Sequence, residues 1–330
     1  MKTDTREKIL EIINNKGQVR AHDLGKSLEI SQVAVHKQLK KLINDGLIVK
    51  IGEPPHVFYF LKKKAAKSVY IGDLDKSTKK FINSRYIYVT PEGLVLEGII
   101  GFAQWTRSIK QEYVFLRLAN RFVQVRKEAD RFFDKKTYIN ATQKFSDTFN
   151  KNYLNEVLYQ DFYSLPEFGK TKLGSLVLHA KQSQSKKLIS DAAEQIFPTI
   201  QKLIKEHKIN AVGFIPHSIP RKLPFLKYLR EKLNLSLPNI DLVKAYAGEI
   251  PVAQKSLSKI EERITNARET IFIKDSDISH KRVLLIDDAV GSGATLNETA
   301  KKLKENYRVK KVYGYAIVGS YKGFEVIKEV

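Results

Sequence analysis

The chain has 330 residues, and its 58 Lys and Arg residues outnumber its 36 Asp and Glu residues, giving a net charge of +22 that favours anionic partners. Apolar residues make up 42% of the chain, which excludes a disordered protein, and the absence of cysteine excludes disulfides, thiolate catalysis and cysteine-based metal sites. No signal-like start and no run of about 18 apolar residues is present, so the sequence predicts a soluble, cytoplasmic protein without a membrane partner.

The first sixty residues predict three short helices followed by a β-hairpin. Ser31 lies where the N-cap of the third helix belongs, and Val35 and Leu39 of that helix have the spacing of core residues. The predicted helices cover about 5–16, 21–28 and 32–44, and the predicted strands cover 47–51 and 57–61.

This order of elements resembles the winged helix–turn–helix of bacterial repressors, and residues 30–42 resemble its recognition helix. Such a helix enters the major groove of double-stranded DNA, where its side chains contact phosphates or base edges. Residues 1–64 contain 13 Lys and Arg against 7 Asp and Glu, a net charge of +6. The alternative is a winged helix used only for protein contacts, which the basic exposed face disfavours. The residues expected at DNA are Ser31, Gln32, His36, Lys37 and Lys40.

Residues 65–164 are expected to form a middle linker or dimerisation region. Residues 86–90 and 94–96 predict a tight hairpin, and helical periodicity extends from about Phe102 to Phe133 with Trp105 in the core. No catalytic motif is present in this region. A homodimer is expected, because winged-helix regulators read paired half-sites.

Residues 165–330 alternate between helical and strand patterns, which predicts an α/β domain with a parallel sheet flanked by helices. The fold class is therefore an N-terminal winged helix, an α+β middle region and a C-terminal α/β domain. The predicted helices cover 186–207, 222–234 and 295–306, and the predicted strands cover 211–215, 240–245, 270–273, 283–286 and 312–318.

The segment 283–296 predicts a phosphate-binding site. A buried strand ends in Asp287 and Asp288, and a loop rich in glycine and hydroxyl groups then leads into a helix. Small residues leave backbone amides open at a helix N-terminus, which attracts an anion, and the carboxylates suit sugar hydroxyls or Mg²⁺. The alternative is an ordinary strand-to-helix turn. A side chain at Gly293 is expected to block the phosphate.

This segment resembles the phosphoribosyl-pyrophosphate signature of type I phosphoribosyltransferases. The resemblance implies that Asp287 and Asp288 hold the ribose hydroxyls, with Mg²⁺, and that the following loop surrounds the 5′-phosphate. The family usually has two threonines where this chain has Gly291 and Ser292. The loop residues implied are Ala289, Val290, Gly291, Ser292, Gly293, Ala294 and Thr295.

Upstream residues are similar to the competence-type, ComF-like branch of that family. The pattern of Gln254, Arg263 and Asn266 matches a mobile segment that closes over the ligand, and a charged helix face is the alternative. The resemblance also places the pyrophosphate beside Arg221 and Lys222, although both could equally be solvated surface cations.

Two functions follow from these resemblances. The first is a transcriptional regulator whose phosphoribosyltransferase-like domain binds phosphoribosyl pyrophosphate or a nucleotide, an architecture similar to the Gram-positive purine repressor family. The alternative is an active phosphoribosyltransferase, in nucleotide metabolism or DNA uptake, with an accessory winged helix. The complete recognition helix and the lack of an identifiable general base favour the regulator.

Overall fold

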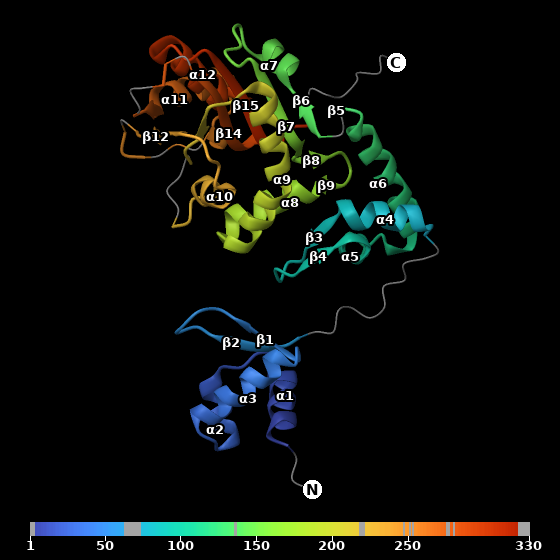
Figure 1. The fold of residues 1–330 in the computed structure, drawn as a ribbon. Coiled ribbons are helices and arrows are strands. Elements are labelled where there is room, and N and C mark those ends of the chain that lie inside the picture. Colours follow the sequence, from blue (N-terminus) through green and yellow to red (C-terminus); the bar gives the residue numbers. More distant parts are fainter. Residues whose placement is uncertain are drawn as a thin grey trace. The chain divides into compact units, whose positions relative to one another are not determined.

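The computed structural model describes residues 4–62, 74–134, 137–217, 222–246, 248–250, 252, 254–274, 278–279 and 281–322. The chain divides into two compact units, 1–69 and 70–330, which Figure 1 colours blue and cyan through red. We name their described parts the winged-helix unit (4–62) and the sheet unit (74–322), and each is described by itself.

The winged-helix unit contains every element that the sequence predicts. Its apolar stripes meet in one core, in which Ile9, Ile13, Leu24 and Leu39 are almost completely buried. Val19 adds a single bridge to the hairpin, exchanging backbone hydrogen bonds with Tyr59 at 3.1 and 2.8 Å. The elements are α1 (Thr5–Lys16), α2 (Ala21–Leu28), α3 (Gln32–Asn44), β1 (Ile48–Ile51) and β2 (Phe58–Leu61).

The sheet unit is built on a seven-stranded sheet in the order β11-β10-β14-β15-β7-β6-β5. The five strands from β11 to β7 run parallel, and β6 pairs antiparallel with both β7 and β5. The predicted α/β class is therefore confirmed. The strands are β5 (Phe133–Asp134), β6 (Tyr138–Asn140), β7 (Glu156–Phe162), β10 (Ala211–Phe214), β11 (Asn239–Ile240), β14 (Arg282–Val290) and β15 (Lys311–Gly319).

Helices cover both faces of this sheet (Figure 1). Crossover connections place α8, α9 and α10 on one face (Figure 1), where α8 contacts β15 and β7 and α10 contacts β10 and β14. The crossover from β14 to β15 places α12 on the other face, with α11 packed against it. The helices are α8 (Lys172–Ser183), α9 (Lys186–His207), α10 (Phe225–Leu233), α11 (Ile260–Thr270) and α12 (Ala294–Tyr307).

The middle region contributes its last strands to the same sheet. Strands β5, β6 and β7 all precede residue 165, and β7 pairs with β15 from Glu156 to Phe162. Three helices and a hairpin precede those strands, joined by a 3₁₀ turn. These elements are α4 (Lys76–Arg85), β3 (Ile87–Val89), β4 (Val95–Glu97), α5 (Gly98–Ser108), η1 (Glu112–Val114) and α6 (Phe115–Asp130). A fourth helix, α7 (Thr142–Thr148), lies between β6 and β7, and β8 (Ser164–Leu165) and β9 (Gly169–Lys170) follow β7.

The hairpin over 86–96 is confirmed, whereas the continuous helix expected from Phe102 to Phe133 is wrong. Lys110 adopts a left-handed conformation at φ 57°, which an α-helix cannot contain, so the chain breaks between α5 and α6. Trp105 is half-buried rather than fully in the core, and its ring packs 5.5 Å from that of Phe168.

A buried ion-pair network joins these helices to the sheet. Arg126 of α6 is 7% exposed and pairs with Asp130 and with Asp161 of β7, each at 2.8 Å. Arg85 of α4 also pairs with Asp130, at 2.7 Å. Since a buried ion pair that loses one partner leaves an uncompensated charge, these contacts hold α4, α6 and β7 in one arrangement.

Two predicted strands have different bounds in the structure. The strand expected over 240–245 is divided at Asp241, because Ile240 pairs with β10 while β12 (Leu242–Lys244) pairs with β13 (Ile271–Ile273). The strand expected to end at Ile286 continues through Ala289 and Val290, which pair with β15. Of the expected phosphate loop, residues 289–295, only Gly291–Gly293 lie outside β14 and α12.

Candidate DNA-binding and phosphate-binding sites

The exposed face of α3 is the candidate DNA-binding site of the winged-helix unit. His36, Lys37 and Lys40 are exposed, and Val35 and Leu39 on the other side of the helix are buried. This polarity is the one expected of a recognition helix, with apolar residues toward the core and donors toward solvent.

Ser31 and Gln32 use their side chains at the start of α3. The Ser31 hydroxyl accepts a hydrogen bond from the Ala34 amide at 3.2 Å, which confirms the predicted N-cap. The Gln32 amide lies across α2, where its Nε2 atom is 2.5 Å from the position that a Cβ on Gly25 would occupy. Gly25 thus permits the close approach of α2 and α3, and Gln32 fills the space.

The sheet unit has a topological switch point between β10 and β14. The chain leaves β10 for α10 on one face of the sheet and leaves β14 for α12 on the other face. The carboxyl ends of the two strands therefore open a crevice, which is where open α/β sheets bind ligands. Asp287, Asp288 and the Gly291–Gly293 loop lie at this edge.

The two adjacent carboxyl groups differ in their surroundings. Asp288 forms an ion pair with Lys181 of α8 at 2.7 Å. Burial, and then the charge of Asp288, raise the pKa of Asp287 to about 7, although Lys181 and Lys244 oppose the shift. Burial therefore disfavours the ionised form of Asp287, a condition that a bound cation or a hydroxyl-bearing ligand would relieve.

The loop leading into α12 leaves the helix N-terminus without a side-chain cap. Gly293 is the N-cap residue at φ 84°, and the Ser292 hydroxyl is a distant 3.5 Å from the Ala294 amide. Gly291 is exposed, and Thr295 is half-buried in the first turn of the helix. Amides at such a terminus suit a phosphate group.

Gly293 is required for a reason that the sequence did not reveal. A Cβ at this position would overlap the ring of Phe145, a buried residue of α7, and the positive φ adds strain. A side chain at Gly293 would thus disturb packing beneath the loop. Gly291 has open space instead, since the nearest atom to its Cβ position is Arg263 Nη1 at 4.0 Å.

The upstream segment lies beside this loop. Arg263 of α11 approaches Gly291, and it is held there by its own Nε donating to the Leu257 carbonyl at 2.8 Å. The Gln254 side-chain amide donates to the backbone carbonyl of Arg263 at 3.1 Å. The side-chain amide oxygen of Asn266 accepts a hydrogen bond from Lys244 at 3.2 Å. The three residues expected on one segment are therefore brought to one side of the crevice.

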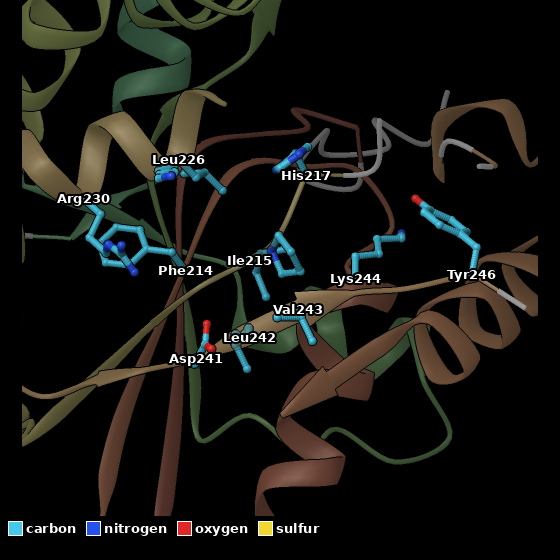
Figure 2. Close-up of a pocket in the computed structure, with 12 residues that line it drawn as sticks. Phe214, Ile215, His217, Leu226, Arg230, Asp241, Leu242, Val243, Lys244 and Tyr246 are labelled. Atoms are coloured by element: carbon cyan, nitrogen blue, oxygen red, sulfur yellow. The ribbon is translucent and has the colours of Figure 1, made fainter. Parts of the chain in front are cut away.

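A pocket of about 470 Å³ adjoins the carboxyl end of β10 (Figure 2). Apolar side chains such as Phe214 and Leu242 line it, with Arg230 of α10 at one end and Lys244 and Tyr246 at the other. In the loop that follows β10, Lys222 is exposed, whereas Arg221 lies outside the described residues.

Sequence reasoning missed Lys244 and Phe145 and assigned no role to Lys181. Burial lowers the pKa of Lys244, whose charge also acts on Asp287. No local motif marks these residues, because α7, α8 and β12 reach the β14 edge only through the sheet topology. The alternating apolar pattern that ends in Lys244 was the available signal.

A magnesium ion fits this donor set in part. Within the described ranges, no group of three or more His, Asp or Glu residues could hold a metal by itself. Mg²⁺ in phosphate sites is typically held by one or two carboxylates together with ligand oxygens. Asp287, whose ionised form burial disfavours, suits that role, whereas Lys181 already pairs with Asp288.

Comparisons with known proteins identify the winged-helix unit. Residues 2–49 match the family model described as winged helix-turn-helix DNA-binding. No curated protein matches the chain in sequence. None of the described helices combines the length and apolarity needed to cross a bilayer.

Two solved structures are similar to part of the chain. A hypoxanthine phosphoribosyltransferase from Staphylococcus aureus is 15% identical, with a TM-score of 0.25 over 44% of this chain and 70% of its own. An adenine phosphoribosyltransferase from Leishmania donovani is 14% identical, with a TM-score of 0.22 over 52% of this chain and 81% of its own.

Proposed function

We propose that this protein is a DNA-binding transcriptional regulator whose sheet unit binds phosphoribosyl pyrophosphate or a nucleotide as its effector. One observation carries the proposal: the Asp287–Asp288 pair and the uncapped Gly291–Gly293 loop meet at the switch point of the sheet. Carboxylates beside free amides match the two halves of a ribose 5′-phosphate.

The ligand's groups would divide among the residues of the crevice. The 5′-phosphate would accept hydrogen bonds from amides between Gly291 and Thr295, and the ribose hydroxyls would donate to Asp287 and Asp288. Lys244 and Lys222 would face the pyrophosphate, the role expected also of Arg221. Bound Mg²⁺ would neutralise charge between Asp287 and the ligand oxygens.

This arrangement gives the binding a pH dependence. Ligand-free Asp287 has a pKa of about 7 and holds a proton below that pH. Accepting two hydroxyls, or approaching Mg²⁺, requires the ionised form. The affinity for phosphoribosyl pyrophosphate with magnesium should rise as the pH increases to about 7 and then level off.

Calorimetry of the full chain with phosphoribosyl pyrophosphate, with and without magnesium, and with nucleoside 5′-monophosphates tests the proposal. Asp287→Asn with Asp288→Asn should abolish the heat of binding, because an amide is a poorer acceptor for the ribose diol. Asp191→Asn is the matched control, since this half-buried carboxylate lies in α9 and pairs only with Lys187 of its own helix among the ion pairs described. No heat and no thermal shift with any of these ligands would contradict an effector site.

Regulation further requires that the effector changes the affinity for DNA. Linkage makes this coupling reciprocal, so a ligand that weakens DNA binding must itself bind less tightly in the presence of DNA. Fluorescence anisotropy with labelled duplex, titrated at several effector concentrations, measures the coupling factor. A coupling factor of one would mean that the protein binds both DNA and the ligand but that the ligand does not regulate DNA binding.

The intact acidic pair also supports the alternative, an active phosphoribosyltransferase with an accessory winged helix. That function predicts steady pyrophosphate release when a nucleobase is added to the protein with phosphoribosyl pyrophosphate and magnesium. The resemblance to the competence-type branch is part of the same proposal. The contacts of Gln254 and Arg263 beside the loop support it.

A homodimer completes the proposed regulator, because two recognition helices are needed for paired half-sites about 34 Å apart. Leu94, Val95 and Ile100 of the β3–β4 hairpin and α5 support a contact in the middle region, since each is between 44% and 54% exposed. Light scattering should report twice the chain mass at micromolar concentration. A monomer with and without DNA would contradict this part of the proposal.

A further inference from the structure

Val33 is an apolar residue at the start of α3 that the folding of the winged-helix unit does not use. Its side chain is 79% exposed, whereas the next most exposed large hydrophobic residues described in this unit, Ile51 and Leu47, are 49% and 43% exposed. Burying a valine stabilises a protein and exposing one does not, so the position contributes little to the core. Single exposed apolar residues are common, so it is the position of Val33 on α3 that points to a role.

Val33 continues the basic face of α3. Residues three, four and seven positions later, namely His36, Lys37 and Lys40, lie on the same side of the helix and are exposed. We name Val33, His36, Lys37 and Lys40 the α3 stripe. Val33 is its amino-terminal member, and the amino-terminal residues of a recognition helix are the ones that reach base edges.

The neighbouring side chains at this end of α3 make contacts within the unit, although those of Ser31 and Gln32 are also exposed. The Ser31 hydroxyl accepts from the Ala34 amide, and the Gln32 amide lies against Gly25 of α2. Ala34 is half-buried. In the first turn of the helix, Val33 is thus the side chain that projects along the stripe.

We propose that Val33 reads a thymine in the major groove by contacting its 5-methyl group. This inference rests on the proposed binding of duplex DNA. The thymine methyl is the apolar group on the major-groove edge of the four base pairs, and an aliphatic side chain recognises it by burying it. Lys37 and Lys40, later in the same stripe, would contact phosphates, which position the helix and read no sequence.

Deoxyuridine is the probe that isolates this contact, because it keeps the pairing and the hydrogen-bonding edge of thymine and lacks only the methyl group. The full chain is first used to select binding sites from a random duplex pool. Each thymine of the selected site is then replaced in turn by deoxyuridine, and affinity is measured by anisotropy at fixed salt. Removing one methyl contact should weaken wild-type binding about fourfold at one position of each half-site.

The variant Val33→Ala completes a double-mutant cycle. It should bind the thymine site about fourfold more weakly than wild type and lose no further affinity with deoxyuridine at the assigned position. Its melting temperature and the salt dependence of its binding should match wild type, because Val33 is exposed and uncharged. The matched control, Lys37→Ala, should bind all sequences more weakly while retaining the fourfold deoxyuridine penalty.

Different outcomes would overturn the Val33 contact and the proposed DNA recognition. A full deoxyuridine penalty that persists in Val33→Ala would assign the methyl contact to another residue and overturn this inference alone. Wild-type binding that is insensitive to deoxyuridine at every thymine would do the same. Failure to select any duplex sequence would instead overturn the proposed DNA recognition, and the role of Val33 with it.

Discussion

Two helix N-termini in this protein begin in opposite ways. Helix α3 starts at Ser31, whose hydroxyl accepts from the Ala34 amide, so the helix closes part of its own terminus. Helix α12 starts at Gly293, which has no side chain to offer. The capped helix presents side chains to a partner, whereas the uncapped helix leaves its backbone amides available.

This difference separates two ways of binding phosphate. Exposed lysines of α3 act at the ends of flexible side chains, which suits the repeated phosphates of a duplex. The amides at α12 are fixed by the backbone, and Asp287 and Asp288 lie beside them, which suits one phosphate attached to a sugar. The two proposed sites would therefore distinguish a polymer from a small ligand although both are anions.

The largest expected effect tests the backbone site. Gly293→Val should destabilise the sheet unit by about 3 kcal/mol, since strain at positive φ adds to overlap with Phe145. Gly291→Val should leave the melting temperature unchanged, because its Cβ position is open, but should abolish ligand binding by crowding the loop. Differential scanning fluorimetry and calorimetry measure the two properties. Equal melting temperatures for the two variants would contradict the distinction.

The next effect tests the side-chain site. Lys37→Ala with Lys40→Ala should reduce DNA affinity by about tenfold or more at physiological salt and lower the salt slope by up to about 2, since two phosphate contacts are removed. Lys8→Ala with Lys16→Ala on α1 is the matched control, with the same loss of charge on another helix of the unit. An unchanged slope in the α3 variant would show that α3 does not dock as proposed.

A smaller effect tests the buried charge beside α12. Asp287 has a folded pKa of about 7, above its unfolded value of 3.8, so the folded state loses stability as the pH rises between those values. Asp287→Asn should therefore stabilise the protein by about 3 kcal/mol more at pH 8 than at pH 5, because the unfolded carboxyl is already ionised at pH 5 whereas the folded one ionises only near pH 7. Thermal melts at both pH values give the difference, and a pH-independent difference would contradict the assignment.

The smallest effect tests the cap itself. Ser31→Ala should cost the winged-helix unit about 1 kcal/mol, because the Ala34 amide loses its acceptor. Ser31→Asn should restore most of that stability, since asparagine is an equally good N-cap residue. Urea unfolding followed by circular dichroism provides the measurement. A loss that Ser31→Asn shares would assign Ser31 a role other than capping.

The two units also differ in how far sequence alone predicts them. Every helix and strand of the winged-helix unit was predicted, because its signals are local: the Ser31 cap, the apolar stripe through Val35 and Leu39, and a tight hairpin. In the sheet unit, Asp287, Asp288 and the glycine loop were also found from local pattern. These predictions needed no knowledge of distant contacts.

What the sequence did not predict depends on distant contacts. Phe145 packs against Gly293 from nearly 150 positions earlier in the chain, and Lys181 reaches Asp288 only after the sheet has formed. The break at Lys110 is a backbone conformation that lysine rarely adopts, so the apolar periodicity of the sequence does not predict it. Pairing of β7 with β15 likewise leaves no local trace.

That pairing has a consequence for how the chain folds as it is synthesised. Strand β15 is completely buried along most of its length and lies between β14 and β7, which is made some 150 residues earlier. Until residues 311–319 leave the ribosome, β7 has a bare parallel edge, and contacts this distant in sequence form slowly. A fragment limited to residues 165–330 would in turn leave β15 as an apolar edge strand, which is a template for aggregation. Strand β15 thus closes the sheet only after the other six strands have been synthesised.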